Sequence, residues 1–132
     1  MRQLVIDARS QGAGSSAITQ LLERVHLGRI DGGAGLTDII LCEVLQGVRD
    51  KSTTEDVKRQ LLKFDVFESG GVDLASEAAR NYRILRSRGH TVRKTVDCLI
   101  ATFCIRDGHS LLHRDRDFDP LEQYLELSVV HA

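Results

Sequence analysis

Acidic residues occupy the positions in this sequence where side chains could carry out chemistry. Asp7 directly follows the apolar run Leu4-Val5-Ile6, and Asp97 follows Thr95, which we expect to cap a helix. Three further carboxylates lie near the starts or ends of expected elements: Glu43, Asp115 and Asp117. If these groups converge, they repel one another and are costly to bury in ionised form. A hard cation such as Mg²⁺ or Mn²⁺ removes that cost and can activate water for attack on a phosphodiester.

The expected elements place these carboxylates on one edge of a sheet. The apolar runs predict short strands at residues 4–6, 36–37, 65–68, 110–113 and 127–130, and helical spacing predicts helices at about 18–25, 38–48, 54–64, 73–88 and 95–107. The cluster Ser52-Thr53-Thr54 is expected to cap the third helix, and Pro120 is expected in the loop between the last two strands. Strands that alternate with helices indicate an α/β domain with a parallel sheet. Ligands of such sheets bind beyond the carboxyl ends of the strands. We therefore expect one α/β domain over residues 1–132, with the acidic residues gathered at that edge.

Composition limits the remaining possibilities. The 132 residues carry 18 basic and 19 acidic side chains, so a protein that binds nucleic acid through overall positive charge is excluded. The scattered cysteines Cys42, Cys98 and Cys104 favour a reducing compartment. The start reaches Asp7 after only three apolar residues, which is not typical of a signal peptide, and no apolar run is long enough to span a membrane. We expect a cytoplasmic protein with no membrane partner.

Other chemistries have weaker support. Residues 12–17 fit the dinucleotide-binding pattern G-x-G-x-x-A, but the first glycine lies five residues after Asp7 rather than directly after the strand, so a flexible turn is favoured and no nucleotide cofactor is expected. No two histidines have the spacing of metal ligands, and a G-x-S-x-G nucleophile elbow is absent from the sequence. His113 lies next to the acidic positions, where a structural role is favoured over assistance in catalysis.

Several segments of the chain resemble PIN-domain toxins of the VapC type. The two most specific are residues 95–101, TVDCLIA, and residues 111–119, LLHRDRDFD. Residues 36–47, LTDIILCEVLQG, resemble the strand and helix that carry the family's glutamate, and residues 79–89 resemble its middle helix less specifically. With the start at Leu4-Val5-Ile6-Asp7, the similarity extends over most of the chain.

The resemblance implies a PIN-like fold, with a central parallel sheet of about four to five short strands flanked by helices. It also implies a metal-dependent endoribonuclease toxin that uses Mg²⁺ or Mn²⁺, forms a homodimer and is neutralised by a cognate VapB-type antitoxin. The implied metal-binding and catalytic residues are Asp7, Glu43, Asp97 and Asp115, with Asp117 as a supporting carboxylate.

One segment departs from the family pattern. The family usually follows its first aspartate with Thr or Ser, whereas here Asp7 is followed by Ala8 and Arg9, so the hydroxyl that would orient the carboxylates is missing. Losses of this kind can weaken metal affinity or activity by about 10- to 100-fold. Arg9 has two interpretations: it contacts a substrate phosphate, or it pairs with the acidic residues in place of a metal. The second keeps open a rival function, a PIN scaffold that binds antitoxin or RNA without cleaving.

Basic residues near the acidic positions are candidates for RNA contact. Arg114 and Arg116 flank Asp115, where they could hold a phosphate or balance the carboxylates. A basic stretch that starts at Arg83 and runs toward Asp97 is explained equally well by a solvated helix face and by contact with the RNA backbone. The candidate RNA-contacting residues are Arg9, Arg93, Lys94, Arg114 and Arg116.

Overall fold

The fold is built on a five-stranded parallel sheet in the order β3-β2-β1-β4-β5. A computed structural model describes residues 3–11 and 33–130 of the chain. The strands are β1 (Leu4–Ile6), β2 (Ala34–Thr37), β3 (Asp65–Phe67), β4 (Ser110–Leu112) and β5 (Ser128–Val130). Each neighbouring pair is parallel. The expected α/β class, the five expected strands and the parallel sheet are therefore confirmed.

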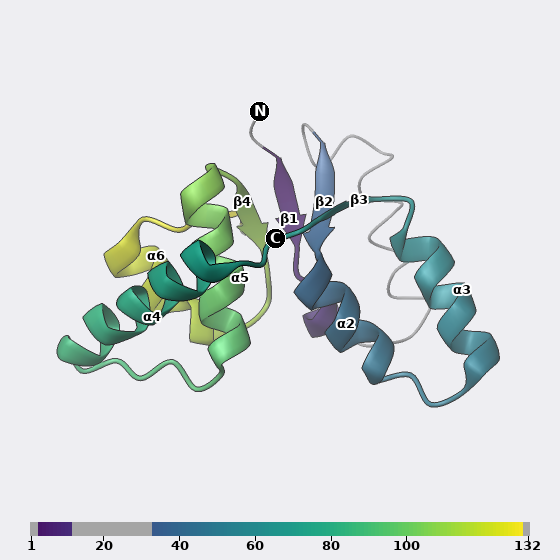
Figure 1. Ribbon diagram of the computed structural model, residues 1–132, viewed down its shortest axis with the longest axis horizontal. Helices are drawn as coiled ribbons and strands as arrows, with labels where there is room; N and C mark the ends of the chain where they lie inside the picture. The colour runs from purple at the N-terminus through teal and green to yellow at the C-terminus, as the bar shows by residue number, and fades with distance from the viewer. Residues whose placement is uncertain (1–2, 12–32, 131–132) are drawn as a thin grey trace.

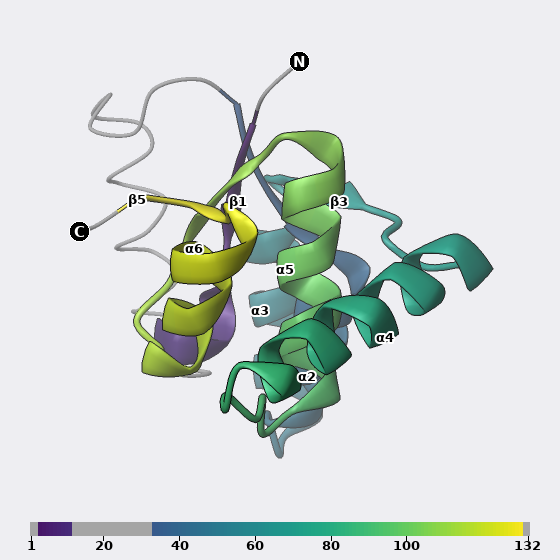
Figure 2. The same ribbon diagram turned by 90° about the vertical axis from the view of Figure 1, so that its left-hand side faces the viewer.

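Helices lie on both sides of these strands. They are α2 (Asp38–Gln46), α3 (Lys51–Leu61), α4 (Val72–Ser87), α5 (Thr95–Asp107) and α6 (Asp119–Leu125). Figure 1 shows α4, α5 and α6 to one side of β1 and β2, and α2 and α3 to the other. Figure 2, turned by a quarter circle, shows α4 crossing α5 near the start of α5. Two short 3-10 helices, η1 (Ala8–Gln11) and η2 (Arg116–Phe118), follow β1 and β4.

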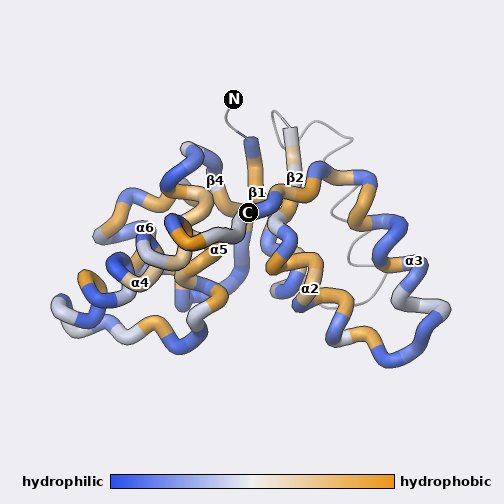
Figure 3. The backbone as a smooth tube through the Cα atoms, in the orientation of Figure 1, coloured by the Kyte–Doolittle hydropathy of each residue, from blue (hydrophilic) through white to orange (hydrophobic). Residues whose placement is uncertain are grey.

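The core explains why these segments adopt these elements. All three residues of β1 are buried, as expected for the central strand of a sheet covered on both faces. The helix α5 is buried over much of its length, including Ile100, Ala101 and Phe103, because it packs between the sheet and α4. Figure 3 shows the outer helix α3 as hydrophilic stretches that alternate with hydrophobic ones. The buried residues of this helix are Val57 and Leu61.

The structure corrects the sequence expectation near Pro120. We placed this proline in a loop, but it lies in the first turn of α6. Proline is favoured there because its fixed φ suits a helix and its missing N–H would have no intrahelical partner in the first turn. Two helix starts also differ: the side chain of Asp50, not the following Ser and Thr residues, caps α3, and Thr95 is the first residue of α5 rather than its cap.

Two sequence predictions lie outside the described residues: the helix at about 18–25 and the glycine-containing pattern at 12–17. Within the described part of the chain, no helix combines the length and apolar character needed to cross a membrane.

Candidate active site

The topology brings the carboxylates to one edge of the sheet. Asp7 extends β1 by one residue, since its N–H donates to the carbonyl oxygen of Leu112 at the end of β4 (2.9 Å). Thr37 ends β2 and caps α2, its hydroxyl accepting from the N–H of Ile40 (3.2 Å), and Glu43 lies in the second turn of that helix. Asp97 lies in the first turn of α5. These strand ends and helix starts meet at the lower edge of the sheet in Figure 1.

Arg9 joins three of these carboxylates through its guanidinium. Its Nε lies 2.8 Å from Oδ1 of Asp7, its Nη1 lies 2.7 Å from Oε2 of Glu43, and its Nη2 lies 2.9 Å from Oδ1 of Asp97. Nη2 also donates to Oδ2 of Asp7 at 2.9 Å. The sequence left open whether Arg9 contacts substrate or pairs with the acidic residues, and the structure shows the pairing. We call Arg9, Asp7, Glu43 and Asp97 the arginine cluster.

Burial makes the arginine cluster electrostatically tight. The side chains of Asp7 and Asp97 are 1% and 0% exposed, and that of Arg9 is 14% exposed. Burial alone would lower the pKa of Arg9, but its hydrogen bonds and charge pairing with Asp7, and its hydrogen bonds to Glu43 and Asp97, raise it above the ordinary value. Arg9 therefore stays cationic. Burial raises the pKa of Asp97, an effect that Arg9 opposes and the nearby Asp115 reinforces.

Three carboxylates form a second group beside the arginine cluster. Asp97, Asp115 and Asp117 each offer an oxygen, and these oxygens lie within 4.8 Å of one another. We call these residues the acidic triad. Asp97 belongs to both groups, and among the described residues its Oδ2 is buried without a hydrogen-bond partner. A carboxylate triad with a buried, unpaired oxygen fits the oxygen ligands that Mg²⁺ and Mn²⁺ prefer.

Local hydrogen bonds fix the segment that carries the triad. The N–H of Asp115 donates to Nδ1 of His113 (3.0 Å), and the N–H of Asp117 donates to Oδ1 of Asp115 (2.9 Å), which caps η2. The His113 ring lies 4.7 Å from that of Phe118, centre to centre. These contacts support the structural role expected for His113. The sequence indicated Asp117 through its spacing from Asp115 and gave it only a supporting role. In the structure, Asp117 lies within the acidic triad.

The remaining basic candidates lie on the surface. Arg93 and Lys94 immediately precede α5 and are exposed, and so are Arg114 and Arg116 on either side of Asp115. In contrast to Arg9, none of these four has a side-chain nitrogen within 4 Å of a carboxylate oxygen among the described residues. Their positions suit contact with a polyanion that approaches the acidic triad.

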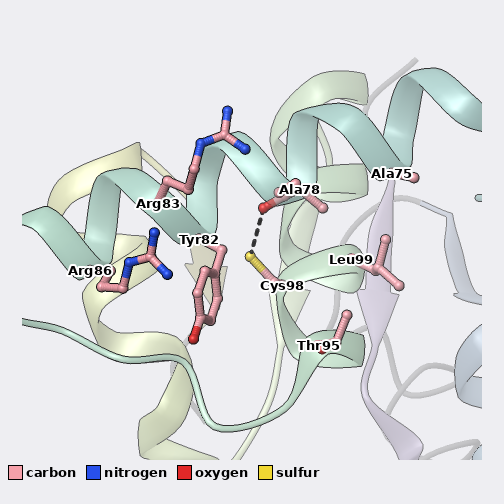
Figure 4. Close-up of a pocket in the computed structure, with 9 residues that line it drawn as sticks. Ala75, Ala78, Tyr82, Arg83, Arg86, Thr95, Cys98 and Leu99 are labelled. Carbon is pink, nitrogen blue, oxygen red and sulfur yellow. Dashed lines mark hydrogen bonds between the residues drawn. The ribbon is translucent and has the colours of Figure 1, made fainter.

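A separate hollow lies between α4 and α5 (Figure 4). It has a volume of about 450 Å³ and is lined mainly by apolar groups of the two helices, with Arg83 and Arg86 on the α4 side. Cys98 is one of its lining residues and donates through Sγ to the carbonyl oxygen of Ala78 (3.3 Å). No carboxylate of the arginine cluster or the acidic triad lines this hollow, so it supplies none of the acidic chemistry.

The family follows from a match over most of the chain. The family model for the PIN domain matches residues 6–122, a span that includes all five carboxylates at the sheet edge. This chain belongs to the PIN-domain family. The expected family and fold are thereby confirmed.

Within the family, relatives of this PIN-domain chain include VapC proteins. It is 38% identical over 93 residues to the VapC ribonuclease Mb1587 of Mycobacterium bovis, a match that covers 68% of this chain and 67% of the relative. Identity and coverage are the same for ribonuclease VapC11 of Mycobacterium tuberculosis.

Solved structures of VapBC proteins share the fold. The chain is similar to one in VapBC2 from Rickettsia felis, bound to a DNA fragment from their promoter, with a TM-score of 0.68, 14% identity and 98% coverage of both chains. It is also similar to one in VapBC-5 of Mycobacterium tuberculosis, with a TM-score of 0.64, 16% identity and coverage of 99% of this chain and 98% of the other. At such identities, the likeness establishes the PIN-like fold and no more.

Proposed function

We propose that this PIN-domain protein is the toxin of a type II toxin–antitoxin pair and acts as a metal-dependent endoribonuclease. The observation that carries the proposal is the convergence of five carboxylates from distant segments on one sheet edge. One of their oxygens, Oδ2 of Asp97, is buried without a hydrogen-bond partner among the described residues. Its VapC relatives at 38% identity are named as ribonucleases, which supports RNA as the substrate.

The proposed catalytic and metal-binding residues are Asp7, Glu43, Asp97 and Asp115, with Asp117 in support. When bound, Mg²⁺ or Mn²⁺ supplies the acidity that activates water and the charge that stabilises the phosphodiester in its transition state. A carboxylate of the cluster accepts a proton from the attacking water. In-line displacement then leaves 5′-phosphate and 3′-hydroxyl ends. No nucleophilic Ser, Cys or His is needed.

The surface around the acidic triad suits an RNA backbone. The exposed side chains of Arg93, Lys94, Arg114 and Arg116 offer positive charge to phosphates, while Arg9 is committed to the carboxylates. We therefore assign RNA contact to the four exposed residues and remove Arg9 from that set. Few aromatic side chains are available for base stacking, so the backbone should dominate affinity.

The proposed partners are a cognate VapB-type antitoxin and a second copy of the chain. Structural similarity to VapBC proteins of Rickettsia felis and Mycobacterium tuberculosis supports the antitoxin. Co-expression and co-purification with a candidate VapB-type antitoxin would test the first partner, and sedimentation of the free toxin would test the dimer.

Cleavage of a structured RNA pool in Mn²⁺ tests the function directly. The wild-type protein should cleave and leave 5′-phosphate ends, whereas Asp97→Asn and the wild type in chelator should not. Asp56→Asn is a matched control because its carboxylate is 57% exposed on α3 and pairs only with Arg59 among the described residues. If neither the wild type nor Asp97→Asn cleaves the RNA, although both are folded and free of antitoxin, the result would count against an endoribonuclease acting on that pool.

The arginine cluster favours one alternative, a PIN scaffold that binds antitoxin or RNA without cleaving. A guanidinium that satisfies Asp7, Glu43 and one oxygen of Asp97 lowers the need for a metal. Binding of RNA without cleavage, together with no change in melting temperature on addition of Mn²⁺, would support this alternative over the enzyme.

A further inference from the structure

We infer that Arg9 is a built-in cation that occupies one half of the acidic site, and that a single divalent ion binds in the other half, on Asp97, Asp115 and Asp117. The inference rests on the proposed function and narrows its metal ligands. Asp97 and Asp115 keep that role together with Asp117, whereas Asp7 and Glu43 bind the guanidinium of Arg9 instead of a metal. Asp97 is the boundary, since its Oδ1 accepts from Arg9 and its Oδ2 has no partner among the described residues.

The first step concerns how completely Arg9 uses its donors. Nε and Nη2 bind both oxygens of Asp7, Nη1 binds Glu43, and Nη2 also reaches Asp97. The planar guanidinium thereby forms a fork against one carboxylate and bridges to two others, a geometry that a lysine ammonium cannot reproduce. A divalent ion at this position would have to displace these contacts.

The second step concerns how the chain holds Arg9 in place. The residue lies in η1, only two positions after Asp7, and its own N–H donates to Oδ1 of Asp7 (3.2 Å). Ala8, 2% exposed, is buried where η1 packs against α2, the helix that carries Glu43. Figure 1 shows this purple turn beside α2. Arg9 is therefore preorganised by local backbone, and the exchange of the usual Thr or Ser for Ala8 is compatible with this packing.

The third step concerns charge. Three carboxylates surround one guanidinium, so the arginine cluster keeps an excess of two negative charges when all of its groups are ionised. Asp115 and Asp117 add two more, close to Asp97. One divalent ion on the triad offsets half of these four negative charges without contacting Arg9, while a second ion beside Arg9 would meet a fixed positive charge.

Titration with Mn²⁺ alone tests the inference without RNA. Binding is measured by calorimetry and by the loss of the electron paramagnetic resonance signal of free Mn²⁺. The wild type should bind one ion per chain. Asp115→Asn and Asp117→Asn should each weaken the affinity for Mn²⁺ by about tenfold or more. Glu43→Gln should leave the dissociation constant unchanged within error, because Glu43 belongs to Arg9. Weakening by Glu43→Gln equal to that by Asp115→Asn, or no binding to the wild type, would overturn the inference.

Arg9→Gln provides the complementary measurement. In this variant, Asp7 and Glu43 lose the guanidinium that they bind, so a second Mn²⁺ should bind and should be lost again in Arg9→Gln/Glu43→Gln. If Arg9→Gln binds only one Mn²⁺, and Arg9→Gln/Glu43→Gln binds it with the same dissociation constant, the inference is overturned. If Arg9→Gln does not fold, the comparison of Glu43→Gln with Asp115→Asn in the wild-type background still decides it. The RNA cleavage assay is separate, so loss of cleavage with the expected Mn²⁺ pattern would reject the proposed function alone.

Discussion

The guanidinium of Arg9 binds both carboxylate oxygens of Asp7, its neighbour two residues earlier, with Nε 2.8 Å from Oδ1 and Nη2 2.9 Å from Oδ2. Such close spacing along the chain means that the ion pair forms with little loss of chain entropy. The same guanidinium then reaches Glu43 and Asp97 from distant segments, so a local contact becomes a link between β1, α2 and α5.

Removal of Arg9 should be costly when no metal is present. Arg9→Gln leaves Asp7 and Asp97 buried without their cation, and the loss of one partner from a buried ion pair costs about 3 to 5 kcal/mol. We expect the free energy of unfolding in urea, measured in chelator at neutral pH, to fall by about this amount. The exposed pair Arg59–Asp56, at 3.2 Å, provides a control: Arg59→Gln should cost about 0 to 1 kcal/mol. Equal costs for the two variants would contradict the importance of burial.

The close approach of β2 to β3 predicts a second sensitive position. A Cβ on Gly35 would lie 2.6 Å from a ring carbon of Phe67 and 2.7 Å from the carbonyl oxygen of Asp65. Since the backbone oxygen cannot move without disturbing the sheet, Gly35→Ala should lower the free energy of unfolding by about 1 to 3 kcal/mol. Gly70→Ala is the control because a Cβ there meets nothing within 4 Å. Similar melting temperatures for both variants would refute the prediction.

The cap of α2, the helix that carries Glu43, predicts a smaller loss of stability when it is removed. Thr37 is fully buried and its hydroxyl accepts from the N–H of Ile40. Thr37→Val keeps the side-chain shape but removes the acceptor. The free energy of unfolding, measured by thermal unfolding, should therefore fall by about 1 kcal/mol. Thr37→Ser keeps the cap and tests the methyl group separately. An unchanged melting temperature for Thr37→Val would mean that the cap contributes nothing to α2.

Cysteine reactivity should differ by position. Cys42 is exposed, whereas Cys98 and Cys104 are buried. Burial raises the pKa of Cys104 to about 12 and also raises that of Cys98. A thiol reagent at pH 8 should therefore label one thiol quickly in the folded protein and three in denaturant, and Cys42→Ser should abolish the fast phase. Rapid labelling in Cys42→Ser would show that the α5 region opens readily.

The pKa of Cys104 also predicts a loss of stability in alkali. Because the folded state favours the protonated thiol, its contribution is complete below the ordinary pKa of 9.0 and is lost progressively as the pH rises toward about 12. Unfolding in urea between pH 8 and pH 11 should show this decline in the wild type. The decline should be shallower in Cys104→Ala, which has no thiol to ionise at that position. Parallel pH profiles would assign the alkaline loss to other groups.

The sequence predicted the three central strands well because β1, β2 and β4 are short and largely buried. Short runs of β-branched and aliphatic residues such as Leu4-Val5-Ile6 are typical of strands that are covered on both faces of a parallel sheet. It did not predict α6, since a lone proline indicates a loop as readily as a first helical turn, and only the packing of Leu121 in the core decides between them. Local pattern was informative where burial and periodicity agreed.

At the candidate site, the sequence identified which carboxylates would meet but not how their charge would be balanced. The positions of Asp7, Asp97 and Asp115 followed from strand ends and a helix start. The partner of Arg9 depended on the path of η1 and on the distance to Glu43, neither of which periodicity encodes. Asp117 joined the acidic triad through the turn that Asp115 caps, a contact only visible once η2 is formed.

The strand order β3-β2-β1-β4-β5 has a consequence for how the chain is made. β1 and β2 are the first two strands to be synthesised and they pair with each other, and the segments that follow them carry Asp7, Arg9 and Glu43. Asp97 and the segment around β4 are synthesised later, and β4 pairs with the opposite side of β1. A ribosome that has added residues only through α4 therefore carries a chain with its arginine and two carboxylates but no acidic triad. For a protein proposed to cut RNA, this order of translation delays completion of the site until the growing polypeptide has passed Asp117.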